Sequence, residues 1–151
     1  MEKRLLYLSL GSNLGDREHN IRLALRMMES QIGELIRQSS FVETEPWGFD
    51  SANAFINAAA CYLTPLAPQE VLLRLKAIER KLGRTVKSTD GVYHDRPIDI
   101  DILLYGREII DTSQLRVPHP LMLQRDFVMI PLSEIISDDD MEWLKNNENC
   151  V

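Results

Sequence analysis

The sequence predicts an α+β fold in which helices pack on a mainly antiparallel sheet. Three observations lead to this expectation: short apolar runs bounded by turn residues, two amphipathic stretches with helical spacing, and the order in which these segments alternate. The chain has 151 residues, of which 44% are hydrophobic and 26% are charged. This length and composition suit one domain with a substantial core.

The first half of the chain predicts one helix among three strands. Residues 5–10 form an apolar run typical of a buried strand, and the turn at residues 11–16 places Asp16 to cap a helix. The helix should end at or just before Gly33, and its apolar face consists of Ile21, Leu25, Met28 and Ile32. Two more strands are expected over about 35–45 and 54–64, with a loop at residues 46–50 between them.

The second half predicts a helix, a long loop, a strand pair and a last helix. Pro68 opens a helix that runs to about Leu82, and Gly83 follows it. Residues 84–95 are polar and are expected to form a loop that acts as a lid. A strand over 98–105 turns at 106–107 into a short partner strand at 108–110, and a helix over about 121–135 has Pro131 as a candidate break.

This order of elements matches the split βαβ plan, the ferredoxin-like sandwich, with its helices on one face of the sheet. We expect residues 1–137 to form a single catalytic domain, followed by an acidic C-terminal tail at 138–151 that is either weakly ordered or a short docked helix. No apolar segment could span a membrane, and Cys61 and Cys150 lack metal-ligand spacing. A cytoplasmic protein is therefore expected.

Two aspartates project from the strand at 98–105. Because side chains alternate along a strand, Asp99 and Asp101 point the same way, roughly 6–7 Å apart. Two carboxylates this close repel each other, so a hard cation such as Mg²⁺ is their natural partner. The alternative is a solvated face on which both acids pair with nearby arginines. The expected faces are Ile98, Ile100, Ile102 and Leu104 on one side, and Asp99, Asp101, Leu103 and Tyr105 on the other.

Charge is unevenly distributed along the chain. The net charge is −6, which argues against non-specific binding of nucleic acid. Residues 74–96 contain seven basic and three acidic residues, so this segment carries +4 and the rest of the chain −10. A basic segment that leads into an acid pair fits a small polyanionic ligand, and the alternative is a helix with a solvated basic face.

Four motifs together resemble one known family: residues 11–16 (GSNLGD), 55–58 (FINA), 96–103 (RPIDIDIL) and 117–120 (VPHP). The chain resembles 6-hydroxymethyl-7,8-dihydropterin pyrophosphokinase of folate biosynthesis from about residue 6 to 136. An R-x-x-D-x-D-x-L motif followed by V-P-H at this distance is a specific combination. The resemblance implies the ferredoxin-like fold, transfer of a pyrophosphoryl group from ATP to the pterin hydroxymethyl, and release of AMP.

The resemblance also implies roles for individual residues. The catalytic set would be Arg84, Arg96, Asp99 and Asp101, with two Mg²⁺ ions held by Asp99 and Asp101. The ATP-binding set would be Glu79, Arg84, Lys87, Arg96, Ile102, Arg116, His119 and Arg125. The pterin-binding set would be Thr44, Glu45, Trp47, Phe55, Asn57, Tyr93 and Phe127. The partners would be small-molecule substrates only, with neither nucleic acid nor membrane, and the protein would be a monomer.

Some positions keep an alternative or depart from the family. Core packing is the alternative for Phe55 and Phe127, and a structural role is the alternative for His119. Residues 93–96 read Tyr-His-Asp-Arg where family members often carry Trp-Gly-Pro-Arg, and Glu45 stands where many carry proline. The turn at 11–16 lacks the lysine of a phosphate-binding P-loop and is interpreted as structural.

Two other classes of protein remain to be separated. Another metal-dependent nucleotidyl transferase would also carry Gly-Ser and D-x-D, but in that class the Gly-Ser lies about a dozen residues before the acids. Ser12 and Asp99 are far apart here. A non-catalytic ferredoxin-like binding domain would not need paired carboxylates beside Arg96 and His119.

Overall fold

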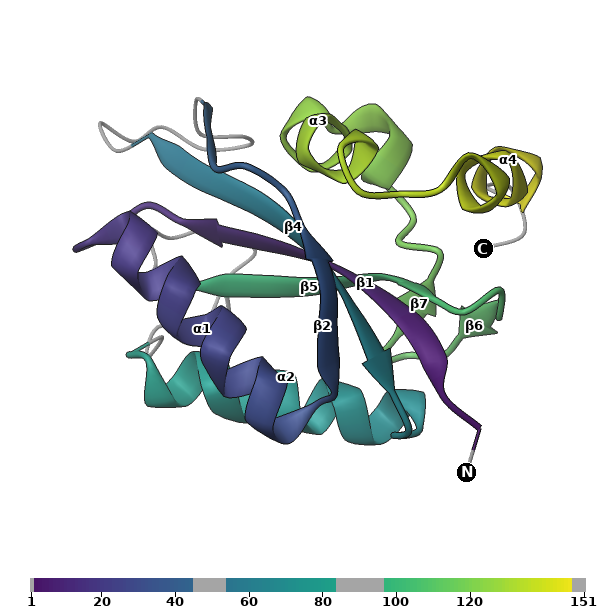
Figure 1. Cartoon of the computed structure of the whole chain (residues 1–151), viewed down its shortest axis with the longest axis horizontal. Coiled ribbons are helices and arrows are strands. Elements are labelled where there is room, and N and C mark those ends of the chain that lie inside the picture. The colour runs from purple at the N-terminus through teal and green to yellow at the C-terminus, as the bar shows by residue number, and fades with distance from the viewer. Residues whose placement is uncertain (1, 45–53, 84–96, 148–151) are drawn as a thin grey trace.

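A computed structural model describes residues 2–44, 54–83 and 97–147 (Figure 1). Four strands form an antiparallel sheet in the order β2-β4-β1-β5, and β3 also pairs with β4. The order is that of the split βαβ plan, so the predicted α+β ferredoxin-like fold is confirmed. The strands are β1 (Arg4–Ser12), β2 (Glu34–Gln38), β3 (Val42–Thr44), β4 (Phe55–Thr64) and β5 (Asp99–Tyr105).

Helices cover both faces of the sheet, so the expectation of helices on one face was wrong. In Figure 1, α1 (Arg17–Gln31) and α2 (Pro68–Lys81) lie below the sheet, and α3 (Asp126–Ser133) and α4 (Asp138–Asn147) lie above it. A short 3₁₀ turn, η1 (Met122–Gln124), precedes α3. The physical reason is that both faces of the sheet carry large apolar side chains, and each face needs a cover.

The two faces have separate hydrophobic cores. The first core lies between the sheet and α1 and α2, and it includes Leu8, Ile21, Tyr62, Leu75 and Ile102. The second core lies under η1, α3 and α4, and it includes Tyr7, Cys61, Leu103, Leu132 and Leu144. We call the corresponding sides of the sheet the first face and the second face. Burial raises the pKa of the Cys61 thiol to about 11, so this cysteine is an inert core residue.

The predicted helix signals are confirmed. Asp16 caps α1, and its carboxylate accepts a 3.2 Å hydrogen bond from the backbone N–H of His19. Pro68 is the first residue of α2, where its missing N–H costs nothing. Gly83 follows α2 with a φ of 101°, a conformation that favours glycine.

The strand expected over 35–45 is two strands, β2 and β3. The two strands are separated at residues 39–41, and the side chain of Ser39 there takes over one of the bonds that a regular β-strand would make to β4 through its backbone. The N–H of Ser39 donates to the carbonyl of Ala59 at 2.9 Å, and the N–H of Ala59 donates to Ser39 Oγ at 2.8 Å. A serine can bond backbone groups in this way, and the sequence alone does not show where it does so.

A bulge interrupts the alternation of β5. β1 pairs Leu8 with Ile102 and the adjacent Tyr7 with Leu104, so Leu103 is an extra residue on β5. The carbonyl of Leu103 accepts a 3.1 Å hydrogen bond from the backbone N–H of His119.

The bulge exchanges the faces of the residues that follow it. Tyr105 packs in the first core and Leu104 in the second, which is the reverse of the expected assignment. Asp99 and Asp101 precede the bulge and keep the predicted alternation with Ile100, which packs in the first core.

Two details after β5 also differ from expectation. The short strand is β6 (Ile110–Asp111), which pairs with β7 (Arg116–Val117) and not with β5. The helical region after residue 121 breaks at Arg125, where η1 ends and α3 begins, and Pro131 lies inside α3. Of the two alternatives for residues 138–147, the structure contains the docked helix, α4, with Leu144 fully buried.

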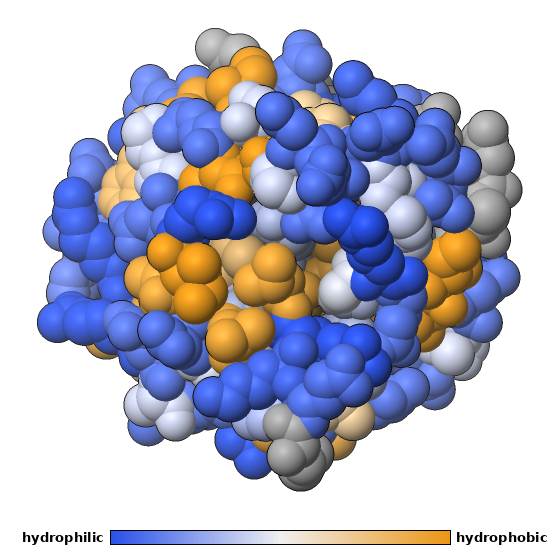
Figure 2. Space-filling model, turned by 45° about the vertical axis from the view of Figure 1, so that its right-hand side comes forward, coloured by the Kyte–Doolittle hydropathy of each residue, from blue (hydrophilic) through white to orange (hydrophobic). Residues whose placement is uncertain are grey.

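The described surface is largely hydrophilic, with small groups of apolar side chains, as Figure 2 shows for one face. The exposed large apolar residues come from separate segments and are Ile36, Leu73, Ile109, Leu121 and Ile130. Within the described residues, no helix is both long and apolar enough to cross a bilayer. The loops expected at 46–50 and 84–95 lie outside the described residues.

Gly33→Ala should destabilise the fold, because a Cβ there would lie 2.1 Å from the backbone oxygen of Leu63 in β4. Moving that backbone should lower the free energy of unfolding by about 2 kcal/mol or more. The measurement is the urea midpoint at an unchanged m-value. Ser30→Ala, on the exposed side of α1, is the control. Equal midpoints for Gly33→Ala and the unmodified chain would contradict the expectation.

Candidate active site

A polar row crosses the second face of the sheet at its open end. Gly11 of β1 pairs with Asn57 of β4 on one side and with Asp99 of β5 on the other. One step along, Ser9 pairs with Asp101. Neighbouring strands lie about 4.8 Å apart, so Asn57 and Asp99 are separated by about 10 Å with no large side chain of β1 between them. The row therefore has a floor made of small residues and polar groups on both sides.

Gly11 is the closest-packed part of this floor. A Cβ at Gly11 would lie 3.2 Å from Asn57 Oδ1 and 3.4 Å from the ring of Phe55. Only a residue without a side chain leaves both neighbours in place. The interpretation of the turn at 11–16 as structural does not single out Gly11, because its place in the floor depends on pairing across three strands.

Three of the residues predicted to bind the pterin lie together at this end of β4. Thr44 pairs with Phe55, and Asn57 Nδ2 donates a 2.6 Å hydrogen bond to Thr44 Oγ1. Asn57 is only 3% exposed, and this bond holds its amide in one orientation. Phe127 lies at the start of α3, with its ring centre 5.6 Å from the guanidinium carbon of Arg125. Phe127 also packs against the second core, which supports the alternative interpretation of this residue as part of the core packing.

A cavity of about 550 Å³ lies along the free edge of β5. Among the described strands β5 ends the sheet, and the cavity is bounded by α2 on one side and by residues 112–125 on the other. Asp99 and Asp101 line it and are half-buried. Every described residue of the predicted ATP set also lines it, namely Glu79, Ile102, Arg116, His119 and Arg125.

The cavity wall also contains residues that the sequence analysis did not select. Lys76 comes from α2, and Thr112, Ser113 and Gln114 come from the connection between β6 and β7. A polar turn is a common signal on a protein surface, and only the pairing of β6 with β7 brings this one to the cavity.

Glu79 fixes the edge strand between the two aspartates. Its side chain is 6% exposed, and Oε2 accepts a 2.7 Å hydrogen bond from the backbone N–H of Ile100. A buried carboxylate needs such a donor to offset its lost hydration. Glu79 therefore positions Asp99 and Asp101 by holding the residue between them.

His119 is held on two sides by backbone bonds. Its N–H donates to the Leu103 carbonyl, and its Nδ1 accepts a 3.4 Å hydrogen bond from the N–H of Leu121. Burial lowers the pKa of His119 below its ordinary value of 6.5, the charge of Arg125 lowers it further, and the charge of Asp99 opposes both. At neutral pH the ring is therefore uncharged, and because Nδ1 accepts a bond, the proton sits on Nε2.

The two carboxylates form a donor set that suits Mg²⁺ bound together with phosphate. Among the described residues, no group of three or more His, Cys, Asp or Glu side chains could enclose a metal ion. Mg²⁺ commonly takes one or two carboxylates and completes its shell with water and substrate phosphates. Asp99 and Asp101 on one face of β5 fit that pattern.

Several predicted site residues lie outside the described part of the chain. They are Glu45 and Trp47 of the pterin set, Arg84, Lys87 and Arg96 of the ATP set, and Tyr93.

The protein is an α+β sandwich with an acid pair on the last described strand of its sheet. The size and the lining of the cavity beside this pair are those of a site for a small ligand. Residues 7–137 match the family model described as 7,8-dihydro-6-hydroxymethylpterin-pyrophosphokinase (HPPK). The chain belongs to this family.

Relatives with curated names agree with the family match. A 2-amino-4-hydroxy-6-hydroxymethyldihydropteridine pyrophosphokinase of Porphyromonas gingivalis is 53% identical over 132 residues, which cover 87% of this chain and 90% of the relative. The protein of the same name from Bacillus subtilis is 41% identical over 139 residues, which cover 91% and 81%. A crystal structure of a Plasmodium falciparum HPPK-DHPS triple mutant with STZ-DHP superposes with a TM-score of 0.72 at 16% identity, over 89% of this chain and 40% of that longer chain. That likeness supports the fold.

The pKa of His119 should move in opposite directions in two variants. Arg125→Gln removes a positive neighbour and should raise the pKa of His119, whereas Asp99→Asn removes a negative one and should lower it. The measurement is an NMR titration of the imidazole carbon shifts in the metal-free protein. In the unmodified chain the ring should gain its proton only below pH 6.5. A pKa that falls in Arg125→Gln would contradict this account of the charges.

Proposed function

We propose that this chain transfers the pyrophosphoryl group of ATP to the hydroxymethyl group of 6-hydroxymethyl-7,8-dihydropterin, with AMP as the second product, and that the reaction requires Mg²⁺. The observation that carries the proposal is the acid pair, Asp99 and Asp101, in the wall of a polar cavity in a chain of the pyrophosphokinase family. The reaction would supply folate biosynthesis with an activated pterin.

The edge cavity suits ATP in size and in chemistry. Its volume of about 550 Å³ falls within the usual range of small-molecule pockets, roughly 300–1,000 Å³. Arg116 and Arg125 offer guanidinium groups to the phosphates, and neutral His119 offers its Nε2–H. The N–H of Ile100 points away from β1, because it donates to Glu79. Residues two apart on a strand direct their backbone groups to the same side, so the N–H and carbonyl of Ile102 also point away from β1, where the polar atoms of an adenine can bond them.

The residues around the acid pair fit two Mg²⁺ ions bound with the triphosphate. Asp99 and Asp101 would hold them, and the ions when bound would neutralise phosphate charge and orient the reacting oxygens. Glu79 would keep the two carboxylates in register through its bond to Ile100. Arg84 and Arg96, by family resemblance, would add charge stabilisation at the phosphates.

The polar row on the second face suits the pterin. Asn57 and Thr44 present a bonded pair of polar groups that can read the amide edge of the ring, and Phe55 offers a flat surface beside them. Phe127 would cover the other side of the ring, and Glu45, Trp47 and Tyr93 would complete the pocket by family resemblance. Because Asn57 and Asp99 share a row across Gly11, a pterin at Asn57 would direct its hydroxymethyl group toward the acid pair.

The chemistry then depends on position and charge. The hydroxymethyl oxygen attacks the β-phosphorus, the bond between that phosphorus and the α-phosphate oxygen breaks, and AMP leaves while the alcohol proton passes to solvent. In-line placement and neutralised phosphate charge can supply most of the acceleration in such a transfer.

The unmodified chain, given ATP, Mg²⁺ and 6-hydroxymethyl-7,8-dihydropterin, should release AMP, and omission of Mg²⁺ should abolish turnover. Asp99→Asn and Asp101→Asn should each lower kcat on the order of 100-fold or more, because they remove charge that binds the metal. Asp139→Asn, on the exposed side of α4, is the matched control. Chromatography of the nucleotides is the measurement. Formation of ADP in place of AMP, or full activity of both acid-pair variants, would overturn the proposal.

Gly11→Ala should weaken pterin binding selectively. The new Cβ would lie 3.2 Å from Asn57 Oδ1, so this amide must shift by a few tenths of an ångström, and it would contact the ring of Phe55 at 3.4 Å. We expect KM for the pterin to rise about threefold to tenfold, since small displacements of binding groups are costly. KM for ATP is the internal control and should stay unchanged. A pterin KM equal to that of the unmodified chain would show that the floor tolerates a side chain.

A further inference from the structure

The wall of the nucleotide cavity has a second, smaller hollow behind it. This hollow has a volume of about 70 Å³. It is lined by Leu144 of α4 and by six residues of the segment 118–124. His119 and Pro120 line both the hollow and the large cavity. The segment 118–124 is therefore a thin partition between the proposed ATP site and the C-terminal helix.

Among the described residues, one backbone bond joins the partition to the sheet, and its other backbone bonds are local turns within residues 119–125. Pro118 and Pro120 have no N–H to donate. His119 bonds to the Leu103 carbonyl, and the N–H of Met122 donates to the carbonyl of His119 at 3.2 Å, as part of a 3₁₀ turn. Such short turns have poor hydrogen-bond geometry. The position of the partition therefore depends on what packs behind it, and Leu144, which is fully buried, lies there.

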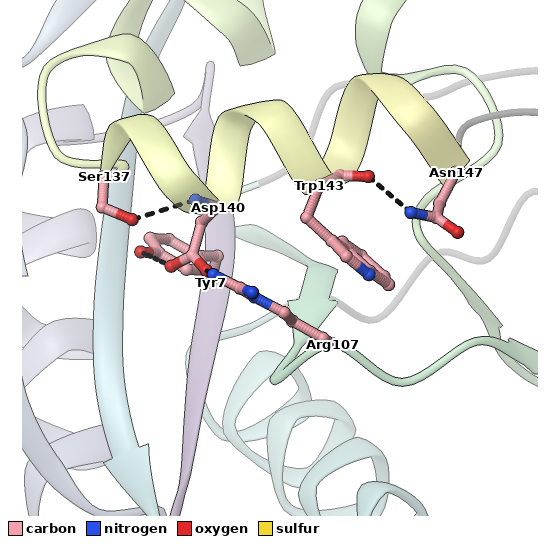
Figure 3. Close-up of polar contacts among 6 residues, drawn as sticks. All are labelled: Tyr7, Arg107, Ser137, Asp140, Trp143 and Asn147. Carbon is pink, nitrogen blue, oxygen red and sulfur yellow. Dashed lines mark hydrogen bonds and ion pairs between the residues drawn. The ribbon is translucent and has the colours of Figure 1, made fainter.

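α4 itself is fastened to the sheet through Asp140, as Figure 3 shows. The hydroxyl of Tyr7 donates a 2.8 Å hydrogen bond to Asp140 Oδ2, and Arg107 lies 3.3 Å from Oδ1 through both Nε and Nη2. The Asp140 N–H donates to Ser137 Oγ at 3.1 Å and so closes the first turn of the helix. Tyr7 is 1% exposed and belongs to β1, which pairs with both β4 and β5, so this bond ties α4 to the interior of the sheet.

We propose that α4 is a positioning element of the nucleotide site, in which Leu144 supports the partition from behind and the bond between Tyr7 and Asp140 holds the helix in place. This inference rests on the proposed binding of ATP in the edge cavity. α4 begins at residue 138, directly after the part of the chain that the family model matches. The helix acts on His119 through the packing of residues 118–124.

The proposal differs from a purely structural role in what it expects of the two substrates. If the helix only covered the second core, a mutation in it would lower the stability of the fold and leave the affinities for both substrates unchanged. A helix that positions the partition changes the affinity for ATP, because the apparent dissociation constant rises as the partition spends less time in its binding position. The pterin row at Asn57 lies on the far side of β1 from this partition, so the affinity for the pterin should change less than the affinity for ATP.

The test compares Leu144→Ala with Leu25→Ala, which removes the same atoms from a buried site in the first core. Both variants are assayed well below their unfolding temperatures. Leu144→Ala should raise KM for ATP, and the dissociation constant of a non-hydrolysable ATP analogue, on the order of tenfold. It should change KM for the pterin by a clearly smaller factor, and Leu144→Met should restore the ATP affinity because it keeps the volume. Leu25→Ala should alter neither affinity.

Tyr7→Phe is the second variant, because it removes the hydroxyl bond to Asp140 without opening a cavity. It should raise the ATP constants about threefold, in the same direction as Leu144→Ala. Equal effects of Leu144→Ala and Leu25→Ala, or a parallel change for ATP and pterin, would overturn the positioning role. If the unmodified chain forms no AMP, the proposed function fails by itself, and binding of the analogue still decides whether α4 positions the cavity wall.

Discussion

The register of β1 against both of its neighbours is the constraint on which the second core and the candidate site both depend. Along the second face, the side chains of β1 shrink from a tyrosine to a serine to a glycine, while their partners change from apolar to polar. The three rows are Cys61–Tyr7–Leu104, Ala59–Ser9–Asp101 and Asn57–Gly11–Asp99. A slip of one residue would turn both aspartates into the first core and the leucines of β1 away from it. Because burial of those carboxylates would be very costly, the core and the site specify the same register.

The graded face also explains why helices cover both sides of the sheet. The first face is apolar along its whole length and needs both α1 and α2. The second face has its main apolar core near Tyr7, under η1, α3 and α4. The polar end near Gly11 contributes the floor of the candidate site. The bulge at Leu103 marks the boundary, since it directs an extra apolar side chain into the second core directly after the acid pair.

Much of this arrangement follows from local sequence, and the rest does not for identifiable reasons. The alternation of β4 and the position of the acid pair could be predicted because they depend on residues two apart in one strand. The bulge could not, because it is defined by which residue of β1 lies opposite, and neither could Gly11, whose importance arises from contacts with β4. Family resemblance selected His119 and Arg125 as ATP-binding residues, and both line the cavity, whereas the resemblance ended near residue 136 and made no prediction for α4. The pattern of residues 138–151 allowed both a tail and a helix, and the buried Leu144 decides for the helix.

The free edge of β5 shows how the protein uses an otherwise hazardous feature. An unpaired strand edge exposes backbone donors and acceptors that invite association with other strands. Here the edge is closed at Ile100 by the carboxylate of Glu79 and at Leu103 by the N–H of His119. Ile102 lies between these two bonds and lines the cavity. Within the described residues, the strand therefore ends the sheet without a long exposed edge. The short stretch of edge that remains lies in the cavity between α2 and residues 112–125, where a small ligand has access to it.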